Sequence, residues 1–277
     1  MKALYWAPVH GQTGTTSNLL ATALIAGQYF NKTGLLTQTH FNYNNLEAPL
    51  LEANADNNKY RNFFREIGID ALARNFKVER LTKEWLDYCC IEVPNTNMKL
   101  LPGTTQTVRE SFDYEMNIVM TPLLKAIEAY CDNIFVDISS GNNPLSMKLM
   151  AEADIVIVNL CQNLNVINLF FEQFKDKLPD KVFYLIGNYD YRSKYNLSNI
   201  RKKYHNYINS KNSDVIPYNT GYHDAQVDGK VVDFIRNNLQ CKEKDPNYYF
   251  IRKAISSTEK LLRLAGVEVE KERPNDI

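Results

Sequence analysis

The sequence predicts a single-domain, three-layer α/β/α fold built on a mostly parallel twisted sheet. Unbroken apolar runs of strand length occur at 133–138, 154–160 and 181–187, and such runs are typical of strands buried on both faces. Helical stretches separate these runs, and strands that alternate with helices at this spacing form a parallel sheet covered on both sides. The 277 residues are enough for one large domain, and no linker or low-complexity segment divides them.

The first half of the chain is expected to begin the sheet and two helical layers. The expected strands are 3–7, 34–37 and 99–103, and the expected helices are 18–30, 60–75, 81–89 and 121–130. The last of these helices is expected to begin at Thr121, because threonine caps helices well and Pro122 suits the first helical turn. The Asn-rich stretch 42–58 reads as a loop.

The second half continues the alternation. The expected strands are 133–138, 154–160, 181–187 and 214–217, and the expected helices are 144–151, 166–178, 197–207, 230–238 and 248–264. The last helix has an apolar stripe with basic residues around it, as a membrane-surface helix has. The polar tail 268–277 favours packing on the protein itself or on a partner instead. We therefore expect one domain over 1–240 and a C-terminal helical extension, 241–277, that packs on it.

The charge balance restricts the partners. Lys+Arg and Asp+Glu both number 32, which argues against a strong sequence-independent nucleic-acid binder. The basic run 201–203 is interpreted as a solvated helix end rather than a DNA contact. No apolar run reaches the roughly 18 residues that span a bilayer, and no secretory signal precedes the first strand. We expect a cytoplasmic protein with reduced cysteines and at most peripheral membrane contact.

Residues 8–18, PVHGQTGTTSN, have the outline of a phosphate-binding loop. A short strand precedes the glycine-punctuated turn, and a helix-forming stretch follows it. The general loop G-x-x-x-x-G-K-[ST] cradles phosphates with backbone N–H groups, and its lysine reaches the β and γ oxygens. The helix that follows supplies a positive N-terminus whatever its side chains are.

Three further polar stretches follow expected strands. They are THFNYN after the second strand, DISSGNN after NIFV, and GNYDYRS after VFYLI. Ligands of open parallel sheets bind at the carboxyl ends of the strands. These stretches and the loop are therefore expected to form one site.

Taken in order, these motifs resemble the ParA/MinD family of deviant-Walker-A P-loop ATPases, nearest to its CpaE/TadZ pilus-assembly localisation branch. The family loop K-G-G-x-G-K-[ST]-[ST] aligns with residues 10–17, and FVDISSG at 135–141 resembles switch II. Residues 187–190 are similar to the segment that reads adenine, and 216–219 to the motif that closes over the base. The resemblance covers about residues 1–240.

The resemblance implies a P-loop NTPase-like fold that binds ATP or ADP with Mg²⁺. The implied nucleotide-binding residues are His10, Gly11, Gln12, Thr13, Gly14, Thr15, Thr16, Ser17, Asn188 and Pro217. Thr16 and Asp137 are the implied metal residues. A homodimer through the P-loop face is also implied.

The departures from the family pattern all remove charge that catalysis uses. Thr15 stands where the phosphate-contacting lysine belongs, and His10 stands where the signature lysine belongs. Gln38 and His40 replace the acidic pair after the second strand. A hydrogen bond to a charged group contributes about 1.5–3 kcal/mol, so nucleotide binding should weaken roughly 10- to 100-fold. Hydrolysis should suffer more, because phosphoryl transfer depends on positioned charge, and no catalytic residue is assigned.

The resulting hypothesis is a degenerate nucleotide-binding protein, a pseudo-ATPase, that positions or assembles other proteins. Its cargo would belong to a pilus or secretion apparatus, a plasmid or another mobile element. Two alternatives stay open: an active ATPase in which His10 or a distant lysine supplies the missing charge, and an interaction scaffold that binds no nucleotide.

Two other constellations predict little. His10 and His40 are expected to meet at the sheet edge, but a metal site needs a third ligand, and no cysteine or acid is near them in sequence. Ser139-Ser140 lacks the G-x-S-x-G context, and no histidine is placed in sequence to activate either hydroxyl. Neither a histidine metal site nor a hydrolase triad is predicted.

Overall fold

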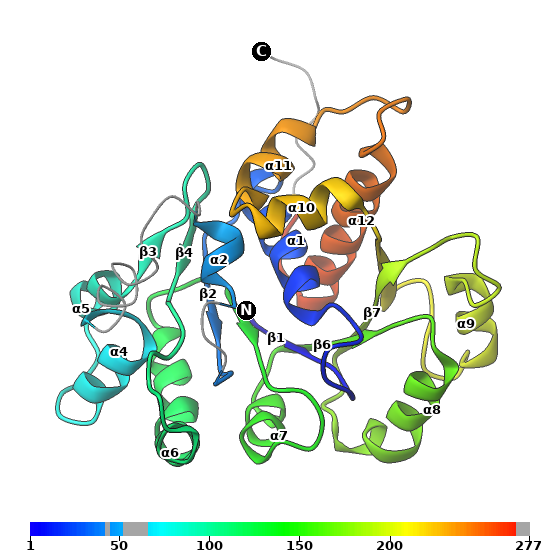
Figure 1. Ribbon diagram of the computed structural model, residues 1–277. Helices are drawn as coiled ribbons and strands as arrows, with labels where there is room; N and C mark the ends of the chain where they lie inside the picture. The colour runs from blue at the N-terminus through cyan, green and yellow to red at the C-terminus, as the bar shows by residue number, and fades with distance from the viewer. Residues whose placement is uncertain (42–44, 52–65, 270–277) are drawn as a thin grey trace.

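The chain builds one sheet between two layers of helices (Figure 1). The computed structural model describes residues 1–41, 45–51 and 66–269. In this part of the chain the sheet has eight strands, in the order β3-β4-β2-β5-β1-β6-β7-β8. The strands are β1 Lys2–Trp6, β2 Gly34–Gln38, β3 Ile91–Glu92, β4 Met98–Leu100, β5 Ile134–Asp137, β6 Ile155–Leu160, β7 Val182–Tyr189 and β8 Ser213–Pro217. All described pairs run parallel except β3 with β4, so the predicted three-layer fold is confirmed.

Each face of the sheet is covered by its own group of helices. One face packs on α1 Thr15–Gln28, α2 Glu47–Leu50, α10 Thr220–Val227, α11 Val231–Asn238 and α12 Tyr248–Ala265. The other face packs on α4 Gly68–Phe76, α5 Lys83–Cys89, α6 Arg109–Ile127, α7 Pro144–Ala151, α8 Leu164–Gln173 and α9 Leu197–Lys203, with a 3₁₀ turn at Lys175–Lys177.

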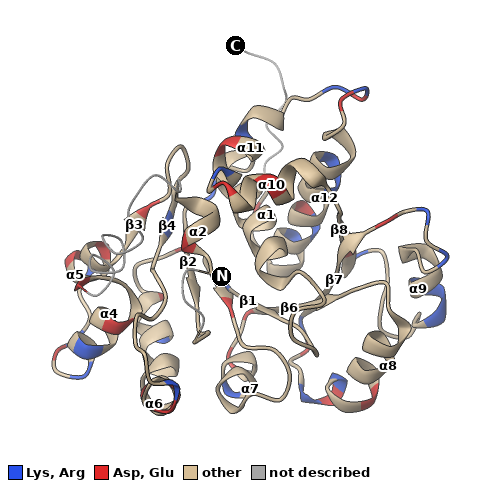
Figure 2. Cartoon of the chain, in the orientation of Figure 1, with Lys and Arg blue, Asp and Glu red and all other residues tan. Residues whose placement is uncertain are grey.

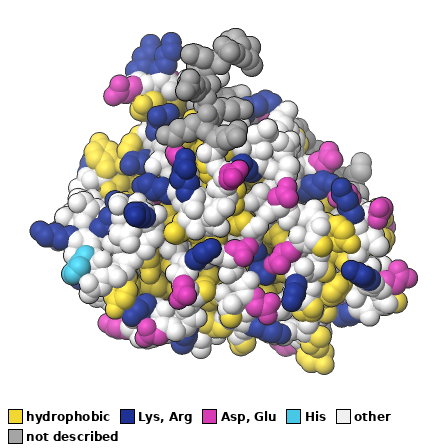
Figure 3. Space-filling view, turned by 180° about the vertical axis from the view of Figure 1, so that it is seen from behind, with side chains coloured by type: hydrophobic (Ala, Val, Ile, Leu, Met, Phe, Trp, Pro, Cys, Tyr) yellow, Lys and Arg dark blue, Asp and Glu magenta, His cyan; other side chains and the backbone are white. Residues whose placement is uncertain are grey.

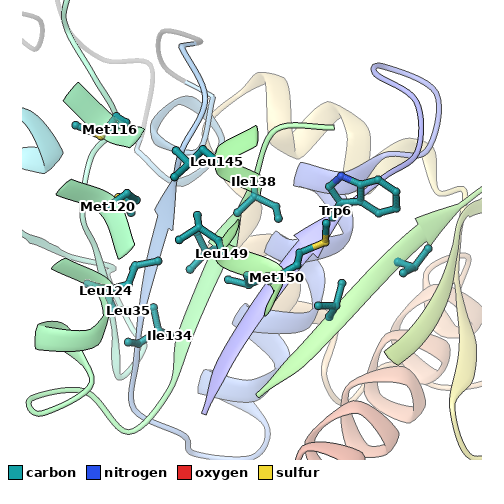
Figure 4. Close-up of a cluster of buried hydrophobic side chains, with 14 of the residues drawn as sticks. Trp6, Leu35, Met116, Met120, Leu124, Ile134, Ile138, Leu145, Leu149 and Met150 are labelled. Carbon is teal, nitrogen blue, oxygen red and sulfur yellow. The ribbon is translucent and has the colours of Figure 1, made fainter. Parts of the chain in front are cut away.

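The central strand β1 shows why the strands are apolar along their whole length. Leu4 and Trp6 belong to one core, and Ala3 and Tyr5 belong to the other. All four side chains are fully buried, because successive residues of a strand point to opposite faces. Figure 4 shows the first core, where Trp6 lies near side chains of α7 while those of α6 extend it on the far side.

Helix α12 packs on the body of the protein. The stripe seen in the sequence is buried, and its members are Phe250, Ile251, Ala254, Ile255, Thr258, Leu261 and Leu262. This stripe shares a core with α1, and the Ser257 hydroxyl donates to the Val215 carbonyl of β8 over 2.8 Å. The sequence left two surroundings for this stripe, a membrane surface and the protein itself. In the structure the stripe packs on the protein itself.

The predicted start of the helix at Thr121 is wrong. Helix α6 begins at Arg109, and Pro122 lies inside it. Phe112 and Met116 on the earlier turns are buried in the core, and this packing outweighs the roughly 3 kcal/mol cost of an internal proline. The Thr121 hydroxyl is buried and has no hydrogen-bond partner within the described part of the chain, so it does not cap a helix there.

The predicted loop 42–58 is also partly wrong. Helix α2 lies within it, with Leu50 in the core and the Glu47 Oε1 atom accepting a hydrogen bond from the Gly103 N–H over 2.5 Å. Residues 42–44 and 52–58, and residues 60–65 of the next predicted helix, lie outside the described residues. A single helical turn is too short to show periodicity, and tertiary contacts hold this one.

None of the described helices has both the length and the apolar character needed to cross a bilayer. On the face opposite to that of Figure 1, Lys and Arg side chains are interspersed with Asp and Glu side chains (Figure 3). This mixed pattern agrees with the overall charge balance.

Candidate functional site

The carboxyl ends of β2, β5 and β1 meet at one cavity, because these three strands are neighbours in the sheet. The cavity has a volume of about 300 Å³. Its lining residues are His10, Gly11, Thr13, Gly14, Thr15, Thr16, Ser17, His40, Asn45, Asp137 and Ser140. The loop after β1 and the polar stretches after β2 and β5 therefore come together, as the parallel-sheet argument predicts.

The loop after β1 presents the N-terminus of α1 to the cavity. Gly11 and Gly14 have φ angles of +74° and +67°, a region that residues with a Cβ rarely adopt. Gly14 precedes the first helical residue, and no side chain caps the helix there. The first turn contains no acidic residue. Backbone N–H groups at such an end form an anion site, so this arrangement fits a phosphate group.

Buried contacts hold the loop in place. The Asn18 side-chain amide donates to the Thr13 carbonyl over 3.2 Å and to the Asn159 side chain on β6 over 2.8 Å. Gly187 on β7 allows the close approach, because a Cβ there would lie 2.2 Å from the Thr13 carbonyl oxygen. The loop is therefore preorganised by β6, which lies beside β1, and by β7, the next strand in the sheet.

Thr16 and Asp137, the predicted metal residues, lie together. The Thr16 hydroxyl donates to Asp137 Oδ2 over 2.5 Å, and Asn45 Nδ2 donates to the Thr16 hydroxyl oxygen over 3.1 Å. Asp137 ends β5 and is fully buried. Its Oδ1 atom accepts no hydrogen bond from the described residues, and an orphaned buried carboxylate oxygen fits a cation.

His40 joins this group, which the sequence analysis missed. Its Nε2 atom lies 3.0 Å from Asp137 Oδ1, and its Nδ1 atom lies 3.4 Å from the Ser139 hydroxyl. An acid therefore lies beside His40, and a histidine lies beside Ser139, although neither is near in sequence. The adjacency of β2 and β5 causes both, and only the strand order could have revealed it.

Of the other predicted residues, His10 lines the cavity, whereas Gln12, Asn188 and Pro217 are not among its described lining residues. His10 and Gln12 are on the exposed part of the loop, so His10 does not share the buried position of His40. Asn188 is the penultimate residue of β7 and has a φ of +48°, and its amide nitrogen lies 3.4 Å from where a Cβ on Gly14 would be. Pro217 ends β8, one strand farther along.

The cavity lacks the positively charged side chain that a phosphate site usually has. Among its described lining residues there is no lysine or arginine, and the ribbon at the N-terminus of α1 carries neither (Figure 2). Thr15 stands at the start of α1, with its hydroxyl 3.1 Å from that of Thr13. Anion binding here depends on the backbone and on any bound cation.

No protein-family model matches the chain, and no curated protein matches it. The solved structures decide the fold. MinD from Pyrococcus horikoshii, complexed with Mg-ADP, superposes with a TM-score of 0.67 at 16% identity, covering 96% of this chain and 98% of MinD. The fold is that of the ParA and MinD ATPases.

Two further structures agree. A ParA family ATPase from Chlorobium tepidum gives a TM-score of 0.67 at 13% identity over 93% of this chain and 98% of its own. MinD in the MinC:MinD complex of Aquifex aeolicus gives 0.57 at 15% identity over 99% of both chains. The predicted P-loop NTPase fold is therefore confirmed, and the resemblance to the ParA/MinD ATPases holds at the level of the fold.

Proposed function

We propose that this protein is a ParA/MinD-like nucleotide-binding positioning or assembly protein with weak or no ATP hydrolysis. The observation that carries the proposal is the glycine loop. It presents an uncapped helix N-terminus to a cavity whose described lining contains no lysine or arginine. We propose as cargo a pilus or secretion apparatus, a plasmid or another mobile element, because the motifs of the chain resemble those of the CpaE/TadZ branch.

The proposed ligand is ATP or ADP with a divalent cation. The backbone from Gly11 to Thr15 would hold the phosphates, and Asn188 and Pro217 would contact the base. Thr16 and Asp137 would hold the cation, which supplies positive charge next to the phosphates. The Mg-ADP in the Pyrococcus MinD structure supports this ligand class.

Hydrolysis is proposed to be weak because the cavity lacks the charges that phosphoryl transfer uses. Thr15 cannot neutralise phosphate oxygens, and His40 stands where an acid would orient the attacking water. Losing one charged contact of this kind typically costs several orders of magnitude in rate.

We further propose a cytoplasmic homodimer that meets through the P-loop face and binds a protein partner of an assembly or partition system. The MinC:MinD complex supports a partner of this class. The zero net charge argues against nucleic acid as the partner.

Thermal stabilisation by ATP or ADP with Mg²⁺ tests nucleotide binding. A ligand at 100 times its Kd stabilises the folded state by about 2.7 kcal/mol, so even weak binding raises Tm at millimolar concentration. We expect Gly14→Val to abolish the shift, because a side chain at φ +67° strains the loop and meets Asn188.

Gly266→Val is the matched control. Gly266 also has a positive φ, +85°, but a Cβ there would meet none of the described residues within 4 Å, and it follows the last residue of α12. A nucleotide shift that Gly14→Val retains would contradict the proposed site. No shift in the wild type at millimolar nucleotide would identify an interaction scaffold instead.

Phosphate release measures hydrolysis. We expect the wild type to turn over ATP no faster than Thr16→Ala. A rate clearly above this control would identify an active ATPase of the same fold.

A further inference from the structure

The cavity contains a pair of potential metal-ligand atoms that the family pattern does not explain, His40 Nε2 and Asp137 Oδ1. We propose that these atoms bind a divalent transition-metal ion, such as Zn²⁺, Co²⁺ or Ni²⁺, in preference to Mg²⁺. The role of this ion next to phosphates rests on the proposed function. The metal site itself can be tested without nucleotide.

The separation of the two atoms suits one metal. They lie 3.0 Å apart. Two ligands about 2.1 Å from the same ion lie about 3.0 Å apart at the 90° angle of octahedral coordination and about 3.4 Å apart at the tetrahedral angle, so the observed separation fits octahedral coordination better. Asp137 is fully buried, and its Oδ1 atom accepts no hydrogen bond from the residues that the structure describes. The recorded contact of this oxygen is with His40 Nε2, and a metal ion held by both atoms would replace that contact.

Ser139 lies beside the other ring nitrogen of His40, and the roles in this contact depend on the tautomer of the ring. The Ser139 hydroxyl oxygen lies 3.4 Å from His40 Nδ1, so it can accept a hydrogen bond from an Nδ1–H. In that tautomer the Nε2 lone pair is directed toward a carboxylate oxygen. Two facing lone pairs repel each other, and a cation between them removes the repulsion. Metal-bound histidines commonly donate their second N–H in this way.

Thr16 and Asn45 orient the carboxylate. The Thr16 hydroxyl donates to Asp137 Oδ2 over 2.5 Å, and Asn45 Nδ2 lies 3.5 Å from the same atom. With Oδ2 engaged, Oδ1 is left as the ligand atom. No group of three His, Cys, Asp or Glu side chains that could hold a metal occurs among the described residues, so water or phosphate oxygens in the cavity would supply the third and further ligands.

The ligand types determine the metal preference. Imidazole suits zinc, nickel and copper, whereas Mg²⁺ prefers oxygen ligands in near-ideal octahedral geometry and retains its water. A family site with acids in this region would favour Mg²⁺, but His40 brings a nitrogen. The bound ion would also place positive charge beside a loop whose described surroundings have no lysine.

Calorimetric titration of chelator-treated, full-length protein with Co²⁺ alone tests the proposal, with Mg²⁺ titrated in parallel. We expect one Co²⁺ site at least tenfold tighter than any Mg²⁺ site, and a Tm that rises with Co²⁺. Because no nucleotide is present, a failure of nucleotide binding would leave this result unaffected. Equal or tighter binding of Mg²⁺ would overturn the proposal.

Three variants locate the site. His40→Gln should lose it, and Ser139→Ala, which keeps both ligand atoms, should weaken it about 10- to 100-fold. His205→Gln, an exposed histidine at the end of α9, is the matched control and should bind like the wild type. All three variants keep the five cysteines, so any binding of Co²⁺ to thiols is the same in each of them.

Retention of the Co²⁺ site in His40→Gln, or an equal loss in His205→Gln, would overturn the proposal. Circular dichroism without metal checks that each variant is folded. Should His40→Gln not fold, Ser139→Ala decides: unchanged affinity would overturn the proposal.

Discussion

At the scale of single residues, Glu47 shows what burial does to an acid. Its side chain is almost fully buried in the contact between α2 and the segment after β4. Oε1 accepts the Gly103 N–H, while Oε2 has no hydrogen-bond partner among the described residues. Burial raises the pKa of Glu47, and the hydrogen bond from Gly103 opposes this only in part.

The raised pKa predicts a pH-dependent stability. An acid whose folded-state pKa is raised stabilises the protein below the unfolded-state value and loses that contribution as pH rises toward the folded-state value. The wild type should therefore lose stability above about pH 4.5, where unfolded Glu47 ionises. Glu47→Gln keeps an oxygen for Gly103 without the ionisation, so it should be more stable than the wild type near pH 7, and the difference should grow as pH rises above about 4.5.

Urea unfolding of both proteins at several pH values measures this difference. Glu92→Gln, an exposed position on the edge strand β3, is the control. Its difference in unfolding free energy from the wild type should not grow with pH as that of Glu47→Gln does. A pH-independent difference between wild type and Glu47→Gln would contradict the assignment.

His40 and Asp137 make a second point at this scale. The two side chains are in direct contact, with His40 Nε2 3.0 Å from Asp137 Oδ1, although they are far apart in the sequence. Asp137 is directly paired with Gln38 in the β2–β5 register, so His40, two residues beyond Gln38, extends past the strand toward the carboxylate.

At the scale of elements, α12 is held to the sheet by polar contacts as well as by its apolar stripe. Asp214 on β8 is buried and accepts hydrogen bonds from Lys260 Nζ over 2.5 Å and from the Ser256 hydroxyl over 3.0 Å. The Lys260 side chain is 34% exposed, so solvent screens the pair in part.

Removing the lysine should destabilise the docking of α12. In Lys260→Met the Asp214 carboxylate stays buried without its cation, and we expect a loss of about 1–3 kcal/mol, below the value for a fully buried pair because of the screening. Guanidinium unfolding measures the loss, with Lys253→Met on the same helix as control. Adding Asp214→Asn should recover part of it, and equal effects of the two lysine variants would refute the role of the pair.

At the scale of the whole molecule, the site lies at the carboxyl ends of the central strands β2, β5 and β1. His10 and Gln12 are exposed on the loop after β1. A two-fold interface places each residue near its own copy when it lies close to the axis. The proposed dimer through the P-loop face would therefore bring the two loops together.

A charge on this loop should break the proposed dimer. We expect the wild type to be a dimer with ATP and Mg²⁺ by light scattering after size-exclusion chromatography, and His10→Glu to be a monomer because like charges would face each other. His205→Glu on α9 is the control and should stay a dimer. A monomeric wild type, or a dimer that His10→Glu leaves unchanged, would refute the P-loop interface.

The sequence by itself determined the fold class and the phosphate-like loop. Strands buried on both faces must be apolar along their length, so β5, β6 and β7 left a local signal that can be read without the structure. The glycines of the loop and the four polar stretches after the strands are local features too. That these features lie at the same side of the sheet followed from the rule that the carboxyl ends of parallel strands lie together.

Only the tertiary structure decided the partners of the buried polar groups. Strand order brought His40 to Asp137, and the contact with Gly103 formed α2 around Glu47. Core packing carried α6 through Pro122 against its local preference. These outcomes depend on pairing between distant segments, and hydrophobic periodicity records the burial of a residue without recording which residues bury it.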